Sequence, residues 1–416
     1  MHMKHIEELV QKIDSAFAKE DWISVKKYNS ELSDYEIREK LTTFHHKPEV
    51  IQIELTSKCN AQCVMCSHYY ELNDCGREAG DNALMRFHEL LPFCKLVLLN
   101  GYGEPFISTN FLDCIKLLRL YRVKAIVTTN LSLLTNSMCK IIPEVFEEIN
   151  VSCNGYDKET YEKIHRGLNF DVFSENLSKL VQIYDSSKIS LSCVVMVETV
   201  KWAPDIIRFA HEKGIKKVRF GRLGVSSFIR NYDQDASNYP NYSSFYLQKA
   251  KKLADELKIE MVFPENYQNS VNENLFDNEQ TEVQQIHFRY DENYQNELRD
   301  EFKIYHAQGT YGCVEQKFDT TAITCRGICD WVAKGLYIDT HGELFTCCES
   351  SFSKYTDGWN GSKAQEFRNE FYNGHLPDFC KNCPFIINNE LKLLECEKRQ
   401  ELYQSTDVVS SLGEDF

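Results

Sequence analysis

Three cysteines stand close together near the start of the chain, in the segment LTSKCNAQCVMCSHYY at residues 55–70. Three residues separate Cys59 from Cys63, and two separate Cys63 from Cys66. Three thiolates on one short loop can bind three irons of a [4Fe–4S] cube, which usually takes four cysteines, so the fourth iron is left open for a substrate or cofactor. Zinc is the competing interpretation, but structural zinc sites usually pair two CxxC units, and no such partner lies near this triad.

A second group of cysteines lies near the C-terminal end. Cys329 and Cys347 flank a pattern typical of a β-hairpin, in which LYID and ELFTC are separated by a turn at 341–342. Cys380 and Cys383 follow as a CxxC pair, so the hairpin can bring four thiolates together; from the residues alone, both zinc and an iron–sulfur cluster suit such a tetrad. The other cysteines of this region are interpreted as bystanders that could substitute or serve an incomplete second site: Cys313, Cys325, Cys348 and Cys396.

The cysteine count also indicates the compartment. The 416 residues include 17 cysteines, and the start of the chain carries acidic residues and no apolar signal core. A chain that stays in the cytoplasm keeps its thiols reduced, so clustered cysteines are better interpreted as metal ligands than as disulfides. Five cysteines stand alone in apolar surroundings and are expected in the core: Cys94, Cys114, Cys139, Cys153 and Cys193.

Charge and hydropathy exclude two classes of partner. The net charge of −15 disfavours binding to nucleic acid or to an anionic membrane surface. No apolar stretch approaches the roughly 18 residues that a membrane-spanning helix needs. The sequence therefore predicts a cytoplasmic protein with neither a nucleic-acid nor a membrane partner.

Elements able to position the first triad alternate along the chain. Short apolar runs are separated by amphipathic helical stretches, which predicts an α/β fold with parallel strands joined by right-handed crossovers. The apolar runs are VIQIEL (50–55), KLVLL (95–99), KAIVTT (124–129), EINVSC (148–153), ISLSCVVMV (189–197) and KKVRF (216–220). Six such units predict a partial (β/α)6 TIM-like barrel, with active-site residues at the carboxyl ends of the strands.

The same pattern gives the expected domain organisation. We expect an N-terminal helical segment at 1–45, the partial barrel at 46–264, and a polar insertion or linker at 265–312 without clear periodicity. A small β-hairpin-plus-helix domain carrying the cysteines follows at 313–400, and a tail occupies 401–416.

The triad and the loops after the next strands resemble the radical S-adenosylmethionine (SAM) superfamily. Its signature is CxxxCxφC after the first strand, and Met65 fills the φ position, where the resemblance places it near the adenine. GYGEP at 101–105 matches the family's Gly-Gly-Glu-Pro motif, which implies that the Gly103 backbone and the Glu104 carboxylate take the amino group of SAM. TTN at 128–130 matches the family's Thr-Asn loop, which makes Asn130 a cofactor-binding candidate.

The stretch SCNGYDKETYEKIHRG at 152–167 resembles a further motif of the superfamily. By that match Ser152 would reach the ribose or carboxylate of SAM, and Arg166 would pair with its carboxylate, a contact suited to a guanidinium. Asn154 stands where the family commonly has Asp. The resemblance covers about residues 48–224.

The resemblance implies a chemistry. SAM chelates the open iron, the reduced cluster passes one electron to the sulfonium, and the resulting 5′-deoxyadenosyl radical removes a hydrogen atom from the substrate. A reducing partner such as flavodoxin or ferredoxin supplies the electron.

The C-terminal cysteines resemble the SPASM/twitch region of the same superfamily, which carries auxiliary [4Fe–4S] clusters. A full SPASM domain continues after its CxxC with two more spaced cysteines, and here only Cys396 follows Cys383. The arrangement is closer to the shorter twitch form with one auxiliary cluster. The implied ligands are Cys329, Cys347, Cys380 and Cys383.

An auxiliary cluster that accepts an electron suits dehydrogenation of a small polar or sugar-like substrate, as in the aminocyclitol dehydrogenases that this architecture resembles. The alternative is modification of a ribosomally made peptide by thioether formation, carbon–carbon crosslinking or epimerisation. Peptide modifiers often carry a β-rich leader-binding domain at the N-terminus, which the helical segment here does not resemble. A zinc-binding structural or nucleic-acid protein is the non-enzyme alternative, and it would be expected to have a basic face and paired CxxC units.

Candidates for acid–base catalysis are few. Glu198 lies just beyond the fifth predicted strand and Arg222 just beyond the sixth, so both could face a substrate. A structural or surface role is the more ordinary interpretation of each.

Overall fold

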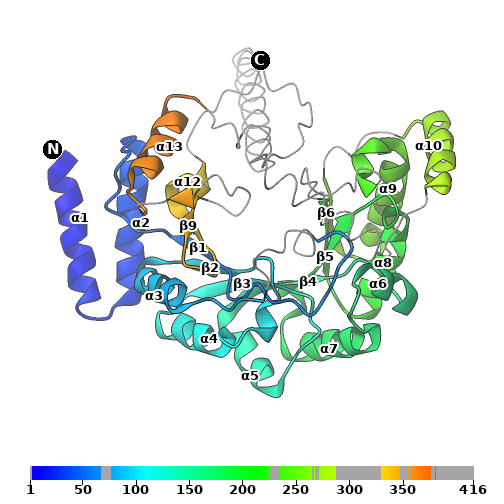
Figure 1. Ribbon diagram of the computed structural model, residues 1–416, viewed down its shortest axis with the longest axis horizontal. Coiled ribbons are helices and arrows are strands. Elements are labelled where there is room, and N and C mark those ends of the chain that lie inside the picture. Colours follow the sequence, from blue (N-terminus) through cyan, green and yellow to red (C-terminus); the bar gives the residue numbers. More distant parts are fainter. Residues whose placement is uncertain are drawn as a thin grey trace, which may run out of the picture.

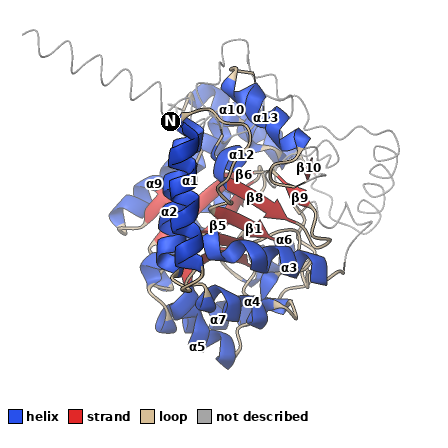
Figure 2. Cartoon of the chain, turned by 90° about the vertical axis from the view of Figure 1, so that its left-hand side faces the viewer, coloured by secondary structure: helices blue, strands red, loops and turns tan. Residues whose placement is uncertain are grey.

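The computed structural model describes residues 2–66, 76–223, 234–264, 267, 271–286, 329–346, 354–355, 358–375 and 380. One twisted sheet runs through this part of the chain, and helices cover its outer face (Figure 1). Figure 2 shows the same arrangement from the side, with the strands enclosed by helices.

The strands follow the predicted apolar runs. Their bounds are β1 Val50–Ile53, β2 Leu96–Leu99, β3 Lys124–Thr129, β4 Phe146–Ser152, β5 Ile189–Val195, β6 Lys217–Arg222, β7 Glu260–Val262, β8 Gly335–Ile338, β9 Leu344–Phe345 and β10 Lys354–Tyr355. The order across the sheet is β10-β9-β8-β1-β2-β3-β4-β5-β6-β7. Strands β1 to β7 pair in parallel, so their carboxyl ends meet at one edge, and the six-unit partial barrel is confirmed.

Helices alternate with these strands. Their bounds are α1 His2–Phe17, α2 Trp22–Arg38, α3 Asp81–Leu90, α4 Phe111–Leu120, α5 Asn136–Val145, α6 Lys158–Ile164, α7 Phe170–Ile183, α8 Ala203–Glu212, α9 Pro240–Glu256, α10 Glu273–Gln285, α12 Asp330–Lys334 and α13 Ser362–Tyr372. No helix in the described ranges is long and apolar enough to cross a membrane.

The predicted C-terminal hairpin is present as β8 and β9, which pair antiparallel. Its position was not predicted. Strand β8 also pairs in parallel with β1, so the hairpin extends the barrel sheet at its first strand. The cysteine-rich region is thereby attached to the strand that leads into the first triad.

Helix α10 differs from the sequence expectation, because it lies inside the polar stretch that showed no clear periodicity. Only Val283 of this helix is buried, so too few apolar positions exist to produce a recognisable pattern. The helix is tied to α9 by Glu279, whose carboxylate accepts hydrogen bonds from the Tyr242 backbone N–H (2.7 Å) and the Asn241 side chain (2.8 Å).

Four of the five isolated cysteines are core residues as expected. Cys94, Cys114, Cys153 and Cys193 are buried, whereas Cys139 is half-buried. They fill space among the apolar side chains of the strands and the helices that cover them.

A hydrogen-bonded group around the buried Glu36 joins α2 to the C-terminal region. Both oxygens of Glu36 accept from neighbouring imidazoles, with His45 Nδ1 and His46 Nδ1 each at 2.7 Å. The other ring nitrogen of His46 lies 3.0 Å from the Ala333 carbonyl oxygen in α12. Burial opposes ionisation of Glu36, but the hydrogen bonds from His46 and His45 outweigh it and hold the pKa of Glu36 below its ordinary value.

Candidate functional site

The loop that carries the first triad follows the carboxyl end of β1. Active sites of folds with parallel strands lie at this end of the sheet. Cys59, Cys63 and Cys66 are each partly exposed. The Cys66 backbone N–H donates to the Cys63 carbonyl at 3.1 Å, which closes a turn. That turn brings the second and third thiols close together.

One side of this loop is held by the turn after α6. The Gln62 N–H donates to the Arg166 carbonyl at 2.8 Å, and the Val64 N–H donates to the Ile164 carbonyl at 3.1 Å. These two bonds lie on either side of Cys63. The second cysteine is therefore fixed in a short backbone ladder.

The surroundings of the thiols favour a bound cation. Burial raises the pKa of Cys59 to about 11 and the pKa of Cys63 well above its ordinary value, and the charges of the neighbouring thiolates add to both effects. A metal that binds thiolates removes this penalty and releases their protons. No three His, Cys, Asp or Glu side chains of the described residues converge on one ion. A cube does not require such convergence, because each cysteine binds a different iron.

Gly103 brings the GYGEP loop against the cysteine loop. A Cβ atom at this position would lie 2.1 Å from the Thr56 carbonyl oxygen, so only glycine permits the approach. The next residue, Glu104, donates its backbone N–H to the Lys58 carbonyl at 2.8 Å. The two loops are therefore joined through their backbones directly before Cys59.

The Glu104 carboxylate connects the GYGEP loop to the loop after β3. It is buried and accepts from Thr129 Oγ1 at 2.7 Å, from the Asn130 N–H at 2.6 Å and from the Phe106 N–H at 3.0 Å. Burial raises the pKa of Glu104, and these hydrogen bonds act in the opposite direction. The carboxylate positions two predicted SAM loops relative to each other, and its contact with the amino group of SAM stays a prediction.

Asn130 reaches the cysteine loop directly. Its side-chain N–H donates to Asn60 Oδ1 at 3.0 Å and lies 4.0 Å from Cys59 Sγ. The Asn60 amide in turn donates to Ser132 Oγ at 2.8 Å. The TTN loop and the first cysteine are thus neighbours, as the motif match required.

The stretch after β4 meets the loop from the opposite side. Ser152 ends β4, and Arg166 is half-buried beside the cysteine loop. Asn154 is buried, and its backbone N–H lies 3.0 Å from His165 Nε2. The other ring nitrogen of His165, Nδ1, lies 3.3 Å from Cys63 Sγ. Burial lowers the pKa of His165 to about 4, so the ring is neutral at physiological pH.

Comparison with known proteins finds no matching family model. "Probable GTP 3′,8-cyclase" of Methanococcus aeolicus is 26% identical over 242 residues, which cover 53% of this chain and 78% of that protein. The "Tungsten-containing aldehyde ferredoxin oxidoreductase cofactor-modifying protein" of Pyrococcus furiosus is 26% identical over 191 residues, 42% of this chain and 51% of the relative. Among solved structures, anSMEcpe with bound AdoMet matches with a TM-score of 0.49 and 16% identity, covering 81% of this chain and 86% of that one.

These relatives point to the radical SAM superfamily, which the motifs of the chain also resemble. SAM and a [4Fe–4S] cluster are the cofactors that this resemblance implies. The triad and three of the loops matched to the superfamily lie around one point of the structure, joined by the hydrogen bonds given above.

Three further residues predicted for the site lie at the same edge of the sheet. Met65 packs against a small apolar cluster that includes Ile164. Glu198 is buried, and its carboxylate forms an ion pair with Lys163 of α6. Arg222 is exposed at the end of β6. Catalytic roles for Glu198 and Arg222 stay predictions, and the ion pair gives Glu198 a structural contact.

The second cysteine group is described only in part. Cys329 is half-buried directly before α12, and Cys380 is buried and packs against the main core. Cys347 and Cys383 lie outside the described residues, as do Cys313, Cys325, Cys348 and Cys396. The predicted tetrad therefore stays a prediction.

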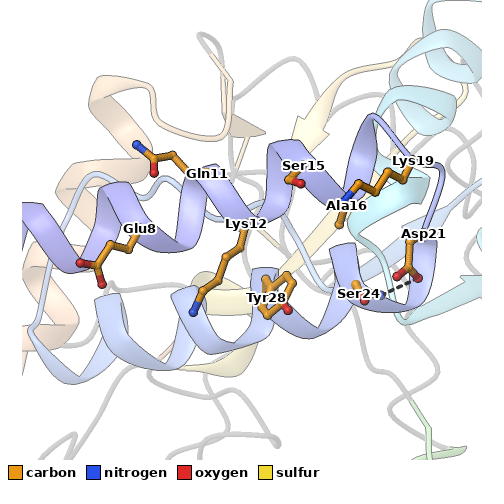
Figure 3. A pocket seen from close by; sticks show the side chains of 9 residues that line it. All are labelled: Glu8, Gln11, Lys12, Ser15, Ala16, Lys19, Asp21, Ser24 and Tyr28. Atoms are coloured by element: carbon orange, nitrogen blue, oxygen red, sulfur yellow. Dashed lines mark hydrogen bonds between the residues drawn. The ribbon is translucent and has the colours of Figure 1, made fainter.

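A surface cavity elsewhere has no part in this site. It lies between α1 and α2, and its walls include Lys12, Asp21 and Tyr28 (Figure 3). The polar side chains are spread along two helices and do not converge on one point.

Sequence reasoning missed His165, Asn60 and Thr129 as members of the site. His165 stands inside a stretch matched to the superfamily, directly before Arg166, and received no role. The available signal was a histidine at the end of the helical stretch TYEKIH at 160–165. Only the fold shows that this histidine points to Cys63.

Proposed function

We propose that the chain binds SAM at the loops around Cys59, Cys63 and Cys66 and uses it to oxidise a small polar or sugar-like substrate. One observation carries the SAM-binding part. The cysteine loop, the GYGEP loop, the TTN loop and the turn after α6 are joined by direct hydrogen bonds. Four segments from different parts of the chain thereby form one site at the carboxyl ends of β1 to β4.

Each loop has a proposed task. Cys59, Cys63 and Cys66 hold three irons, and the open iron takes the amino and carboxylate groups of SAM. The backbone of Gly103 and the carboxylate of Glu104 orient the amino group. When bound, the cluster and SAM supply a 5′-deoxyadenosyl radical, which removes a hydrogen atom from a substrate carbon.

The remaining contacts to SAM are proposed for polar side chains on the other loops. Asn130 lies beside Cys59, Ser152 ends β4, and Arg166 lies beside Gln62. Arg166 suits the SAM carboxylate, because a guanidinium can donate two parallel hydrogen bonds to it. Met65 would pack against the adenine.

Oxidation of the substrate requires an electron acceptor after the hydrogen atom has left. We assign that task to an auxiliary [4Fe–4S] cluster on Cys329, Cys347, Cys380 and Cys383. The pairing of β8 with β1 supports this, because the segment after Cys329 shares a sheet with the strand before Cys59. The electron would pass to this cluster and the hydroxyl proton to a base, for which the Glu198 carboxylate is the candidate, so that an alcohol becomes a ketone; Arg222, which stays protonated, could orient the substrate instead.

A small polar substrate is proposed because an electron-accepting cluster suits the oxidation of an alcohol. Peptide modification is the competing outcome of the substrate test below.

Iron and acid-labile sulfide per chain test the cofactor assignment. The anaerobically reconstituted protein should contain about eight irons, and about four after Cys59, Cys63 and Cys66 are all changed to Ala. The matched control is Cys139→Ala, which should keep all its iron. About twelve irons falling to about eight would add a second auxiliary cluster. Four falling to none would contradict the electron-acceptor role, and iron unaffected by the triple variant would contradict the triad.

Deuterium transfer tests the substrate class. Reduced protein with SAM is offered cyclitols and sugars deuterated at carbons that bear hydroxyl groups, and separately deuterated peptides. Deuterium in the 5′-deoxyadenosine formed identifies the molecule that loses hydrogen. Label from the sugars with a ketone product supports the proposal, and label from peptides alone replaces it.

A further inference from the structure

The side chain of His165 lies between Cys63 and Asn154 and is fully buried. Its Nδ1 is 3.3 Å from Cys63 Sγ. Its Nε2 is 3.0 Å from the backbone nitrogen of Asn154 and 3.2 Å from the Asn154 side-chain amide nitrogen. The histidine thus makes a polar contact at each ring nitrogen, and one of them is to a proposed cluster ligand.

The contact at Nε2 decides which ring nitrogen carries the hydrogen. A backbone N–H can only donate, so Nε2 must accept and cannot itself carry a hydrogen. The Asn154 side chain presents a second donor to the same atom, because its Oδ1 accepts from the Val194 N–H at 2.6 Å. The imidazole therefore carries its hydrogen on Nδ1, which faces Cys63 Sγ.

The ring has little freedom to leave this position. It packs against Tyr161 in a tilted arrangement, with ring centroids 4.6 Å apart and an interplanar angle of 30°. The His165 backbone N–H donates to the Tyr161 carbonyl at 2.8 Å, and the ladder bonds of Gln62 and Val64 lie on either side of Cys63. Tyr161 thus holds the donor ring in place, and the two backbone hydrogen bonds hold the residue that carries the sulfur.

We infer that His165 donates its Nδ1–H to the Cys63 sulfur and thereby raises the reduction potential of the cluster that binds SAM. The inference rests on the proposed function, in which Cys63 is a cluster ligand. A hydrogen bond to a ligand sulfur withdraws electron density from it and stabilises the more negative, reduced cluster. His165 is a positioning residue, because it acts through Cys63.

Three substitutions at His165 separate the effect of the donor from that of the ring. In His165→Asn the side-chain amide nitrogen takes nearly the place of Nδ1 and keeps a donor. His165→Phe keeps a ring against Tyr161 and removes the donor, and His165→Met is a second variant without a donor. His88→Asn is the control, because His88 is exposed and contacts Tyr121.

The measurement is an EPR-monitored redox titration of the signal that changes when SAM is added, with iron counted in every variant. Loss of the donor should lower the equilibrium constant for one-electron reduction of the cluster about tenfold, which corresponds to a fall of about 59 mV in its reduction potential. The potentials of His165→Asn and His88→Asn should stay near that of the unaltered protein. An unchanged potential in His165→Phe or His165→Met overturns the inference, and so does an equal fall in all three His165 variants. Loss of the triad's iron from both apolar variants, with His165→Asn still loaded, overturns it in favour of a role in assembly.

Failure of the proposed function is recognised separately. In that case the unaltered protein has no SAM-sensitive cluster signal, or its iron is unaffected by changing Cys59, Cys63 and Cys66 to Ala. The inference about His165 fails only where that signal is present and its potential does not depend on the donor.

Discussion

Two buried carboxylates position the loops of the site. Glu104 joins the loop after β2 to the end of β3 through two hydrogen bonds, from Thr129 and Asn130. Glu54 follows β1 and accepts from the Tyr102 N–H at 2.6 Å. Burial, assisted by the nearby charge of Asp339, raises the pKa of Glu54 to about 7. Burying a carboxylate costs free energy of desolvation. The hydrogen bonds that each of these two carboxylates accepts offset part of this cost and fix the loops in place.

Glu54 should make the stability of the protein depend on pH. Its folded pKa of about 7 lies above the ordinary value of 4.5, so between these values the folded chain binds a proton that the unfolded chain has lost. The free energy of unfolding therefore falls as the pH rises through this window, by at most about 3 kcal/mol. In Glu54→Gln this fall should disappear. Urea unfolding at pH 5 and pH 8 measures the difference.

The control for Glu54→Gln is Glu159→Gln, at an exposed position of α6. The control should follow the pH dependence of the unaltered protein. If Glu54→Gln also follows it, the carboxylate does not hold the proton.

At the scale of elements, the hairpin turn between β8 and β9 contacts the start of α3. The Gly80 N–H donates to the Thr340 carbonyl at 3.1 Å, and the Asn82 side chain donates to the His341 carbonyl at 3.2 Å. Gly342 has a φ of +79°, and a Cβ there would lie 2.8 Å from the Ala83 nitrogen. The hairpin is thus docked on the helix that comes next after the cysteine loop.

Gly342→Ala should weaken this docking by more than its backbone strain alone. Gly358 has a φ of +94° and open space where a Cβ would lie, so Gly358→Ala has the strain without the contact. We expect Gly342→Ala to lower the free energy of unfolding by about 1–2 kcal/mol more than Gly358→Ala. Urea unfolding of both variants, with hydrogen exchange in the first turn of α3, measures the effect. Equal losses would mean that the turn does not depend on the close approach.

At the scale of the whole molecule, the two ends of the described chain are packed together. Helix α12 contacts both α2 and α13, and the three helices gather on the left of Figure 1. Arg368 of α13 is fully buried, with its guanidinium 3.9 Å from the ring centre of Phe44 and 4.5 Å from that of Trp359. It donates to the Thr42 carbonyl at 2.9 Å and to the Trp359 carbonyl at 2.7 Å. The N-terminal segment is therefore part of the attachment of the cysteine-rich region.

Arg368→Ala should loosen both ends together. It leaves two buried carbonyl groups without their donor and a space between two rings, which should lower the free energy of unfolding by about 3 kcal/mol. Hydrogen exchange should increase in α2 as well as in α13. Arg208→Ala, on the exposed side of α8, is the control and should change neither. Faster exchange in α13 alone would mean that the N-terminal helices do not support it.

Much of this molecule was predictable from local pattern. The apolar runs predicted the strands β1 to β6, because a strand buried on both faces is a short continuous apolar run. The spacing of Cys59, Cys63 and Cys66 indicated the cofactor, and LYID with ELFTC predicted the hairpin. Helix α10 was missed, because its exposure removes the apolar stripe on which such predictions depend.

By itself the sequence indicated the superfamily and determined the order of strands and helices, since ligand spacing and hydrophobic period are local properties of the chain. The tertiary structure alone decided which distant residues meet. The pairing of β8 with β1, and the contact of His165 with Cys63 across 102 positions, depend on how the elements pack. Neither leaves a local pattern, because a buried polar contact is specified by its partner and not by its neighbours in sequence.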